Sequence, residues 1–360
     1  MNADEKRKLK LEKELALTPI SNFLEDYQAD LGDGSKKYRG LVSGFTEVDD
    51  LIDGLDRFIL LAGRSGAGKT SLALQLAVGV AERGTPVIIY SLEMSREEII
   101  TKLLQVISHQ QYGYGLFANT IDLRGNDPKL DKDTKEALQA SLEHLNDVGK
   151  VLYVRDSANG VPDILDYDDN RRKSKQTLKT IYQDVIEAKA KHKVDRVLVL
   201  IDSVQDIVKV ENNQQTQAEV SALEDLTILQ QRTGATILAT AQKNKASTTS
   251  NDDYGDVMGS MSYIHKPNTV LMLDTPREMI RGASGKSTLT KTQQQTLRDV
   301  ENEGRKGGVR PMLLKSIKGR FTGTKAMPLS YYGAYAYFTS EKPDRYADFY
   351  TECGLIDDKA

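Results

Sequence analysis

A glycine-rich segment followed by a lysine and a threonine carries the clearest chemistry in this sequence. Gly63, Gly68, Lys69 and Thr70 fit the pattern GxxxxGK[ST], in which backbone N–H groups surround a phosphate chain and the lysine ammonium reaches its outer oxygens. Glycines are needed because a Cβ atom would clash with the anion, and the following helix directs its positive dipole end at the same charge. The residues that we expect to bind the phosphate chain are Gly63, Arg64, Ser65, Gly66, Ala67, Gly68, Lys69, Thr70 and Ser71.

A second match to the motif, Gly285-Lys286-Ser287, serves as an internal control. It lacks the first glycine, because Ile280 stands five residues before Gly285, and no buried strand precedes it. The first motif instead follows the hydrophobic run 58–62 and precedes a helical pattern. We therefore interpret only the first motif as a phosphate-binding loop.

Carboxylates follow two further hydrophobic runs. Glu93 comes just after the predicted strand 85–90, and Asp202 ends the run 196–202, which is typical of a strand buried on both faces. The carboxyl ends of parallel strands lie beside the nucleotide in open α/β sheets, so Glu93 can act as the water-activating base. Asp202 can bind Mg²⁺ opposite the Thr70 hydroxyl; the alternative for such an aspartate is a helix cap.

The predicted strand 235–241 ends at Gln242, which can sense the terminal phosphate through a hydrogen bond. The loop beyond it is rich in small polar donors and contains Lys243, Asn244 and Lys245. Such a loop suits contacts with the phosphate backbone of a nucleic acid, but many comparable loops are merely solvated.

These side chains require an α/β fold, with a mainly parallel central sheet flanked by helices and a terminal β-hairpin within residues 321–338. A short helix is predicted over residues 19–31, because apolar residues recur at helical spacing after Pro19. Its apolar face can dock either on a neighbouring subunit or on its own domain.

Composition indicates a globular, cytoplasmic protein. Hydrophobic residues make up 39% of the 360, no run is long enough to span a membrane, and the N-terminus lacks the apolar core of a signal peptide. One cysteine excludes an intrachain disulfide, and one cysteine with four scattered histidines argues against a structural zinc site. The net charge of −3 leaves nucleic-acid binding open, since 49 basic and 52 acidic residues could be segregated by the fold.

Several motifs, taken in order, resemble the RecA-like motor domain of DnaB-type hexameric replicative helicases, from about residue 41 to residue 338. Besides the phosphate loop they are GlyPheThrGluValAspAspLeu, SerLeuGluMetSer, LeuIleAspSerValGln, the strand ending in AlaGln, GlySerMetSer and LysGlyArgPheThrGlyThr. The resemblance implies a DNA helicase that hydrolyses ATP with Mg²⁺ at subunit interfaces. Its implied partners are single-stranded DNA, further copies of the chain in a hexamer, and a primase or helicase loader.

The resemblance also implies residue roles. Lys69 and Thr70 would bind triphosphate and magnesium, Glu93 would polarise the attacking water, and Asp202 would complete the metal shell. Gln242 would sense the γ-phosphate. Lys318 and Arg320 would reach the ATP of the neighbouring subunit as trans-acting cations, which contribute a factor of roughly 10³ to 10⁵ in rate.

The expected organisation is an N-terminal extension with a linker helix at 1–40, a motor domain at 41–338, and a C-terminal tail at 339–360 with no assigned role. About forty residues precede the motor, so we expect the chain to lack the family's N-terminal helical domain. Segments 165–179 and 276–308 have no clear family counterpart and are interpreted as insertions.

Two alternative functions stay open. One is a RecA-like recombinase that builds a filament on DNA, which open helical filaments rather than closed rings would reveal. The other is an ATP-dependent assembly switch that responds to a protein partner rather than to DNA.

Overall fold

A computed structural model gives the fold of this chain. The structure describes residues 19–24, 27–28, 37–113, 132–156, 170–207, 215–243, 261–284, 289–305, 308–319 and 322–355. The predicted DNA contacts Asn244 and Lys245, the predicted trans-acting Arg320, and residues 165–169 of the first expected insertion lie outside these ranges.

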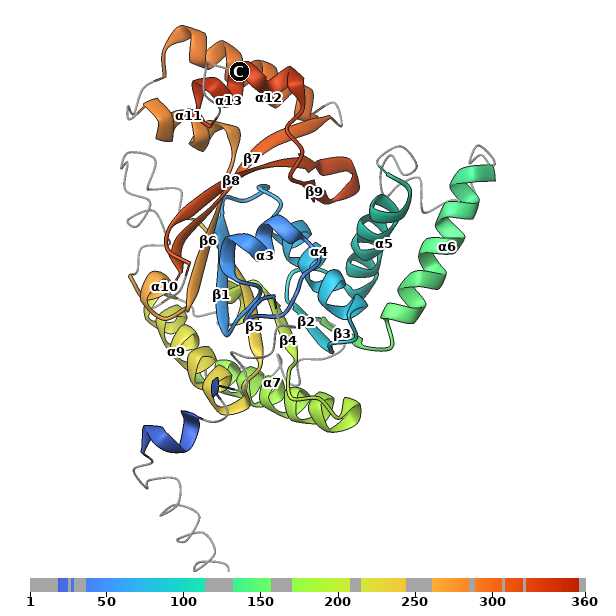
Figure 1. Cartoon of the computed structure of the whole chain (residues 1–360), viewed down its shortest axis with the longest axis vertical. Coiled ribbons are helices and arrows are strands. Elements are labelled where there is room, and N and C mark those ends of the chain that lie inside the picture. Colours follow the sequence, from blue (N-terminus) through green and yellow to red (C-terminus); the bar gives the residue numbers. More distant parts are fainter. Residues whose placement is uncertain are drawn as a thin grey trace, which may run out of the picture. The chain divides into compact units, whose positions relative to one another are not determined.

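The described strands form one sheet in the order β3-β2-β4-β5-β1-β6-β7-β8-β9 (Figure 1). Their bounds are β1 (Phe58–Gly63), β2 (Val87–Ser91), β3 (Leu152–Asp156), β4 (Leu198–Asp202), β5 (Thr236–Gln242), β6 (Thr269–Asp274), β7 (Val309–Gly319), β8 (Lys325–Tyr332) and β9 (Tyr337–Thr339). Strands β1 to β6 pair in parallel, and β6, β7, β8 and β9 pair antiparallel. The predicted mainly parallel sheet and terminal hairpin are confirmed.

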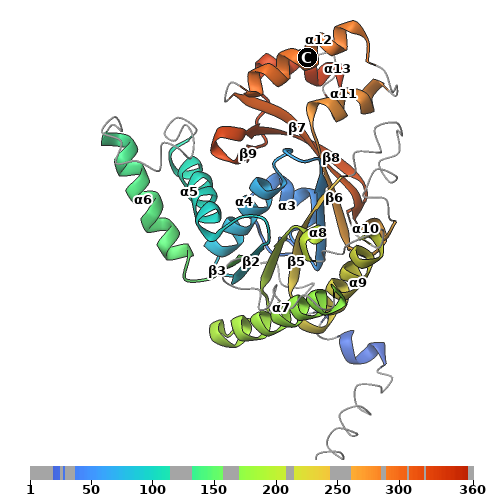
Figure 2. The ribbon, with the colours of Figure 1, turned by 180° about the vertical axis from the view of Figure 1, so that it is seen from behind.

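Helices cover both faces of the sheet, and Figure 2 shows α7 and α9 on the face opposite α3 and α4. Their bounds are α3 (Thr46–Ile52), α4 (Lys69–Glu82), α5 (Arg96–Tyr112), α6 (Lys132–Val148), α7 (Asn170–His192), α8 (Val204–Ile207), α9 (Gln215–Thr233), α10 (Ser262–His265), α11 (Pro276–Ser284), α12 (Lys291–Arg305) and α13 (Ala347–Glu352), with 3₁₀ turns η1 (Ile20–Phe23), η4 (Gly333–Tyr335) and η5 (Asp344–Tyr346).

The two faces follow from the alternation of side chains along each strand. In β1, Ile59 and Leu61 pack in the hydrophobic cluster that contains α4 and α5, whereas Phe58, Leu60 and Ala62 pack in the cluster that contains α7 and α9. All six residues of β1 are buried. The strand that leads into the phosphate loop is therefore held from both sides.

The loop before α3 is fixed by a buried carboxylate. Asp49 is fully buried and accepts hydrogen bonds from the Ser43 hydroxyl at 2.7 Å and from the backbone N–H of Gly44 at 3.2 Å. This loop lies directly on α4, where a Cβ atom added to Gly79 would stand 1.6 Å from the Ser43 carbonyl oxygen. The glycine inside α4 is thus explained by the close approach of another backbone.

The C-terminal part of the chain contains a third hydrophobic cluster, which the sequence analysis did not anticipate. Helices α11 and α12 occupy most of the expected insertion 276–308, and they pack with α13 of the tail against β7 (Figure 1). The residues of these helices in the buried hydrophobic cluster are Met279, Ile280, Leu297, Val300, Phe349 and Tyr350. The tail, to which no role was assigned, is therefore part of a core. In the expected insertion 165–179, residues from Asn170 onward belong to α7.

His109 of α5 lies among three tyrosine rings, and burial lowers its pKa to about 4. The unfolded value is about 6.5. Between these values the unfolded chain binds more protons than the folded one, so we expect the free energy of unfolding to fall as the pH falls from about 6.5 towards 4. Urea denaturation across this range should show a shallower pH dependence for His109→Gln than for the unsubstituted protein.

The control for this measurement is His265→Gln, which replaces an exposed histidine of α10. It should keep the pH dependence of the unsubstituted protein. Equal slopes for His109→Gln and the unsubstituted protein would show that His109 is not held neutral by the fold.

Residue contacts divide the chain into two units, Met1–Arg39 and Gly40–Ala360. In the first unit, the predicted helix 19–31 is observed as the 3₁₀ turn η1, with helical residues at Leu24 and at 27–28. Within the described residues, no helix combines the length and apolarity needed to cross a membrane.

Candidate nucleotide site

The phosphate loop connects β1 to α4 in a conformation that requires glycine. Gly66 and Gly68 have φ values of +74° and +91°, in the left-handed region that residues with a Cβ atom rarely adopt. A Cβ atom on Gly63 would lie 2.8 Å from the Leu273 carbonyl oxygen, and one on Gly68 would lie 2.8 Å from the Phe338 ring. The geometry therefore fits the role that we predicted from the motif.

The terminal hairpin supports the phosphate loop from behind. The rings of Tyr331 and Phe338 stack with centroids 4.3 Å apart, and the Ser71 and Tyr331 hydroxyls lie 3.2 Å apart. Gln75 of α4 donates to the Phe338 carbonyl at 2.9 Å and accepts from its N–H at 2.8 Å. These contacts join the first turns of α4 to the hairpin, although the residues are more than 250 positions apart in the sequence. The hairpin therefore helps to hold the start of α4 in place.

Lys69 begins α4, and its ammonium donates to the Arg64 carbonyl oxygen at 2.9 Å. Burial lowers the pKa of Lys69, and the carboxylates of Asp202, Glu93 and Glu278 oppose this change. The charges of three acidic groups thus act on this one ammonium. An ammonium in such a position can approach a phosphate oxygen and still be attracted by these carboxylates.

Thr70 and Asp202 meet directly. The Thr70 hydroxyl donates to one carboxylate oxygen of Asp202 at 2.7 Å, and the Thr240 hydroxyl of β5 donates to the other. Asp202 is only 8% exposed. One hydroxyl and one carboxylate at this distance are hard oxygen ligands, which Mg²⁺ prefers, so the donor set fits the predicted metal site.

Glu93 lies just beyond the end of β2, which pairs with β4 so that Ser91 stands opposite Asp202. The turn is held by the Leu92 N–H, which donates to the Asp202 carbonyl at 3.0 Å. The next helix, α5, starts at a capping box in which Ser95 and Glu98 bond each other's backbone. Glu93 therefore lies on a turn that is anchored on both sides, close to Asp202.

Gln242 ends β5 directly beside the phosphate loop, since it pairs with Gly63 in the parallel register. Its side chain is exposed, as a sensor of a bound phosphate requires. The next residue differs from our expectation. Lys243 is 5% exposed and lies 3.3 Å from Glu278, so it is buried inside the site and does not present its charge to DNA.

Lys318 also differs from the expected role. Its ammonium donates to the carbonyl oxygens of Ile264, His265 and Pro267 at 2.7, 2.8 and 2.6 Å. These three bonds use all the donors of an ammonium group. Lys318 thus closes the turn after α10 within its own chain, and we do not assign it to the ATP of a neighbouring subunit.

Three residues near the site were missed by the sequence analysis: Thr240, Lys102 and Glu278. Thr240 precedes Gln242 by two positions, so strand alternation places it on the same side of the sheet. Burial lowers the pKa of Lys102, and the charge of Asp202 opposes this change. Glu278 had a sequence signal, because Thr275-Pro276-Arg277-Glu278 resembles a helix-start motif.

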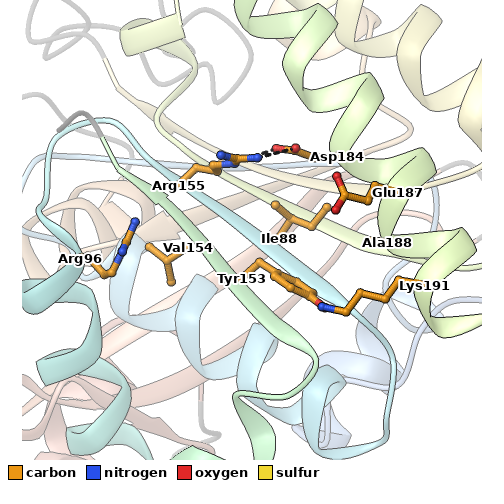
Figure 3. A pocket seen from close by; sticks show the side chains of 9 residues that line it. All are labelled: Ile88, Arg96, Tyr153, Val154, Arg155, Asp184, Glu187, Ala188 and Lys191. Atoms are coloured by element: carbon orange, nitrogen blue, oxygen red, sulfur yellow. Dashed lines mark hydrogen bonds and ion pairs between the residues drawn. The ribbon is translucent and has the colours of Figure 1, made fainter. Parts of the chain in front are cut away.

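A separate pocket of about 250 Å³ lies at the edge strand β3 (Figure 3). Arg155 and Asp184 form an ion pair at 2.7 Å in its wall, and Lys191 lies over the Tyr153 ring. Its lining contains none of the residues that we predicted to bind nucleotide, metal or DNA.

Comparison with known protein families agrees with this geometry. The family model of the DnaB-like helicase C terminal domain matches residues 40–296, which reaches into the segment that we had interpreted as an insertion. Among curated proteins, the chain is 35% identical over 128 residues to the replicative DNA helicase DnaB of Leifsonia xyli, covering 33% of this chain and 24% of that protein. It is 35% identical over 103 residues to DnaB of Nostoc, covering 28% and 11%.

The curated relatives are thus matched over less than a quarter of their length. Among solved structures, the ATPase domain of G40P superposes with a TM-score of 0.66 at 16% identity, covering 91% of this chain and all of that one. A DnaB-like replicative helicase, solved in a study of its interactions with primase, superposes with a TM-score of 0.63 at 17% identity, covering 90% and 67%. These structures share the RecA-like ATPase fold with this chain.

The matched family model spans well over half of the chain, and the loop, the strand ends and the hairpin have the arrangement that the sequence motifs predicted. This chain therefore belongs to the DnaB-like helicase C-terminal domain family.

Proposed function

We propose that this protein is an ATP-dependent DNA helicase that translocates on single-stranded DNA as a ring, a hexamer, during DNA replication, in the cytoplasm. The observation that carries the proposal is the convergence of charged and polar side chains at the carboxyl ends of four neighbouring strands. Lys69, Glu93, Asp202 and Gln242 follow β1, β2, β4 and β5, which lie side by side. Membership of a replicative helicase family supports the same reading.

Each residue has a distinct proposed task. Lys69 and the backbone of the phosphate loop bind the triphosphate, and Thr70 and Asp202 hold Mg²⁺, which would neutralise phosphate charge. Glu93 orients and polarises the attacking water from the anchored turn after β2. Gln242 would form a hydrogen bond with the terminal phosphate and so couple its presence to the loop that follows. Phosphoryl transfer depends mainly on such positioning and charge stabilisation, so the site needs no covalent intermediate on the protein.

Assembly into a ring would add a residue of the neighbouring subunit to the nucleotide site, and the N-terminal unit would contact another subunit. In that unit Ile20, Leu24 and Tyr27 are 78%, 44% and 57% exposed, which supports docking of this segment on another subunit. Arg320 would supply the trans-acting cation. We retain the division into a linker at 1–40, a motor at 41–338 and a tail at 339–360. A primase or helicase loader is the proposed protein partner, in line with the solved relative studied with primase.

The test is ATP hydrolysis with and without single-stranded DNA, with particle size recorded by light scattering in the same samples. We expect strong stimulation by DNA together with a hexamer-sized particle, and an affinity for DNA that falls steeply with salt. Lys69-dependent hydrolysis without stimulation would contradict the helicase and favour the assembly switch. Open filaments on DNA would favour the recombinase.

A further inference from the structure

The carboxylate of Asp202 accepts hydrogen bonds from two hydroxyl groups on different elements. The Thr70 hydroxyl, in the first turn of α4, donates to Oδ2 at 2.7 Å, and the Thr240 hydroxyl of β5 donates to Oδ1. A hydroxyl has one proton and two lone pairs, and an ionised carboxylate can only accept. Because the Thr70 proton points at Asp202, the lone pairs of its oxygen stay available to a metal ion. Thr240 has no such task, and its hydroxyl contacts Asp202 from the neighbouring strand.

The register of the sheet brings Thr240 to this position. Strands β4 and β5 pair in parallel with Ile201 opposite Ala239, so the next residue of each strand, Asp202 and Thr240, are neighbours at the edge of the sheet. Leu238, two positions before Thr240, packs in the hydrophobic cluster that contains α4. Strand alternation therefore turns the Thr240 side chain towards α4, the helix that begins beside the phosphate loop.

Thr240 is placed to fix the plane of the Asp202 carboxylate. The torsion that rotates an aspartate carboxylate has a broad, roughly twofold profile, so the side chain itself does not select one plane. Thr240 is fully buried in a central strand, and its β-branched side chain is stiff about its first torsion. A donor held in this way limits the rotation of Asp202, and Asp202 in turn orients the Thr70 hydroxyl.

We propose that Thr240 is a positioning residue that fixes Asp202 for Mg²⁺ and makes the site select Mg²⁺ over Ca²⁺. Mg²⁺ demands near-ideal octahedral geometry and keeps several waters, whereas Ca²⁺ takes more ligands and accepts both oxygens of one carboxylate. A cation that coordinated both oxygens of Asp202 would have to displace the Thr240 hydroxyl from Oδ1. That displacement would leave a fully buried hydroxyl without this acceptor, which is costly. This inference rests on the proposed function, and it adds a residue outside the expected metal ligands.

The test measures the affinity of the full chain for a fluorescent, non-hydrolysable ATP analogue in EDTA, in excess Mg²⁺ and in excess Ca²⁺. In the unsubstituted protein, Mg²⁺ should tighten binding at least tenfold over EDTA, and more than Ca²⁺ does. In Thr240→Val, which keeps the shape of the side chain and loses its hydroxyl, the Mg²⁺ factor should fall about tenfold, a loss typical of a removed partner of a metal ligand. It should then lie within twofold of the Ca²⁺ factor. Affinity in EDTA should change less than twofold, because the phosphate loop is intact.

Two further variants separate the hydroxyl from the packing of β5. Thr240→Ser keeps the hydroxyl, so it should keep both the Mg²⁺ factor and the preference over Ca²⁺, and it tests the proposal even where Thr240→Val does not fold. Thr236→Val is the matched control, since Thr236 is also buried and lies four positions earlier on the same face of β5. It should bind the analogue with the unsubstituted Mg²⁺ and Ca²⁺ factors.

The outcomes distinguish this inference from the function beneath it. An unchanged Mg²⁺ factor in Thr240→Val, or a lost one in Thr240→Ser, would overturn the role of Thr240 and leave the nucleotide site in place. An unsubstituted protein that binds the analogue equally well in EDTA and in Mg²⁺ would remove the proposed metal site and this inference together.

Discussion

Replacement of Lys69 by alanine should lower kcat for ATP hydrolysis by about 10² to 10³, the loss typical of one removed electrostatic donor in a phosphoryl-transfer site. The physical reason is that the Lys69 ammonium is already placed. It donates to the Arg64 carbonyl at 2.9 Å, on a loop held between β1 and the stacked Tyr331 and Phe338 rings. The ammonium would exchange this bond for one to a phosphate oxygen while the loop itself stays held.

The measurement is steady-state phosphate release at saturating ATP, with and without single-stranded DNA. Lys286→Ala is the matched control, because it changes the lysine of the second GlyLysSer sequence, which lacks the first glycine of the motif. It should keep normal turnover. A Lys69→Ala protein that hydrolyses ATP as fast as the Lys286→Ala protein would show that the phosphate loop is not the site of hydrolysis.

Replacement of Arg320 by alanine should lower turnover by a factor of roughly 10³ to 10⁵, the contribution of a trans-acting arginine to phosphoryl transfer. Arg320 follows β7, two residues after Lys318, whose ammonium is bound within its own chain. The arginine therefore carries the whole of the proposed trans contribution. Its charge would stabilise the transition state in the site of the adjacent subunit, so the loss should appear in kcat more than in nucleotide affinity.

Mixing experiments test the trans assignment directly. Equimolar Lys69→Ala and Arg320→Ala proteins should recover activity on assembly, because a mixed interface can combine an intact Lys69 from one subunit with an intact Arg320 from the next. Lys318→Ala should not be rescued by mixing with Lys69→Ala, since its three carbonyl contacts are internal. Normal turnover by a demonstrably monomeric Arg320→Ala protein would refute the trans-acting role.

The sequence predicted the elements whose signals are local. The run 58–62, the phosphate loop and the following helix occupy consecutive residues, and the structure places β1 and α4 there. The strands that end near Glu93, Asp202 and Gln242 were likewise predicted from buried apolar runs, because both faces of a central parallel strand are covered. The meeting of Thr70 and Asp202 followed from the rule that carboxyl ends of parallel strands share one edge.

The helices of the C-terminal region were not predicted, because their apolar residues are few and widely spaced. The core positions of α11 and α12 stand among many polar residues, so the segment 276–308 resembled a polar insertion. Tyr346, Phe349 and Tyr350 of the tail are buried and recur at helical spacing, but they were overlooked because the stretch is short and lies among charged residues. Only the surface offered by β7 shows which side of each helix is covered.

By itself, the sequence predicted the phosphate loop, the order of the strands along the chain and the residues of the proposed metal site. Only the tertiary structure decided which partners the ammonium groups of the long lysine side chains contact. Lys243 and Lys318 are flexible cations, and either could have faced solvent, DNA or another subunit. Glu278 and three backbone carbonyls capture them instead, from positions 35 to 54 residues away in the chain. A buried cation takes whichever partner the fold brings within reach, and that partner is set by the order of strands in the sheet and not by neighbouring residues.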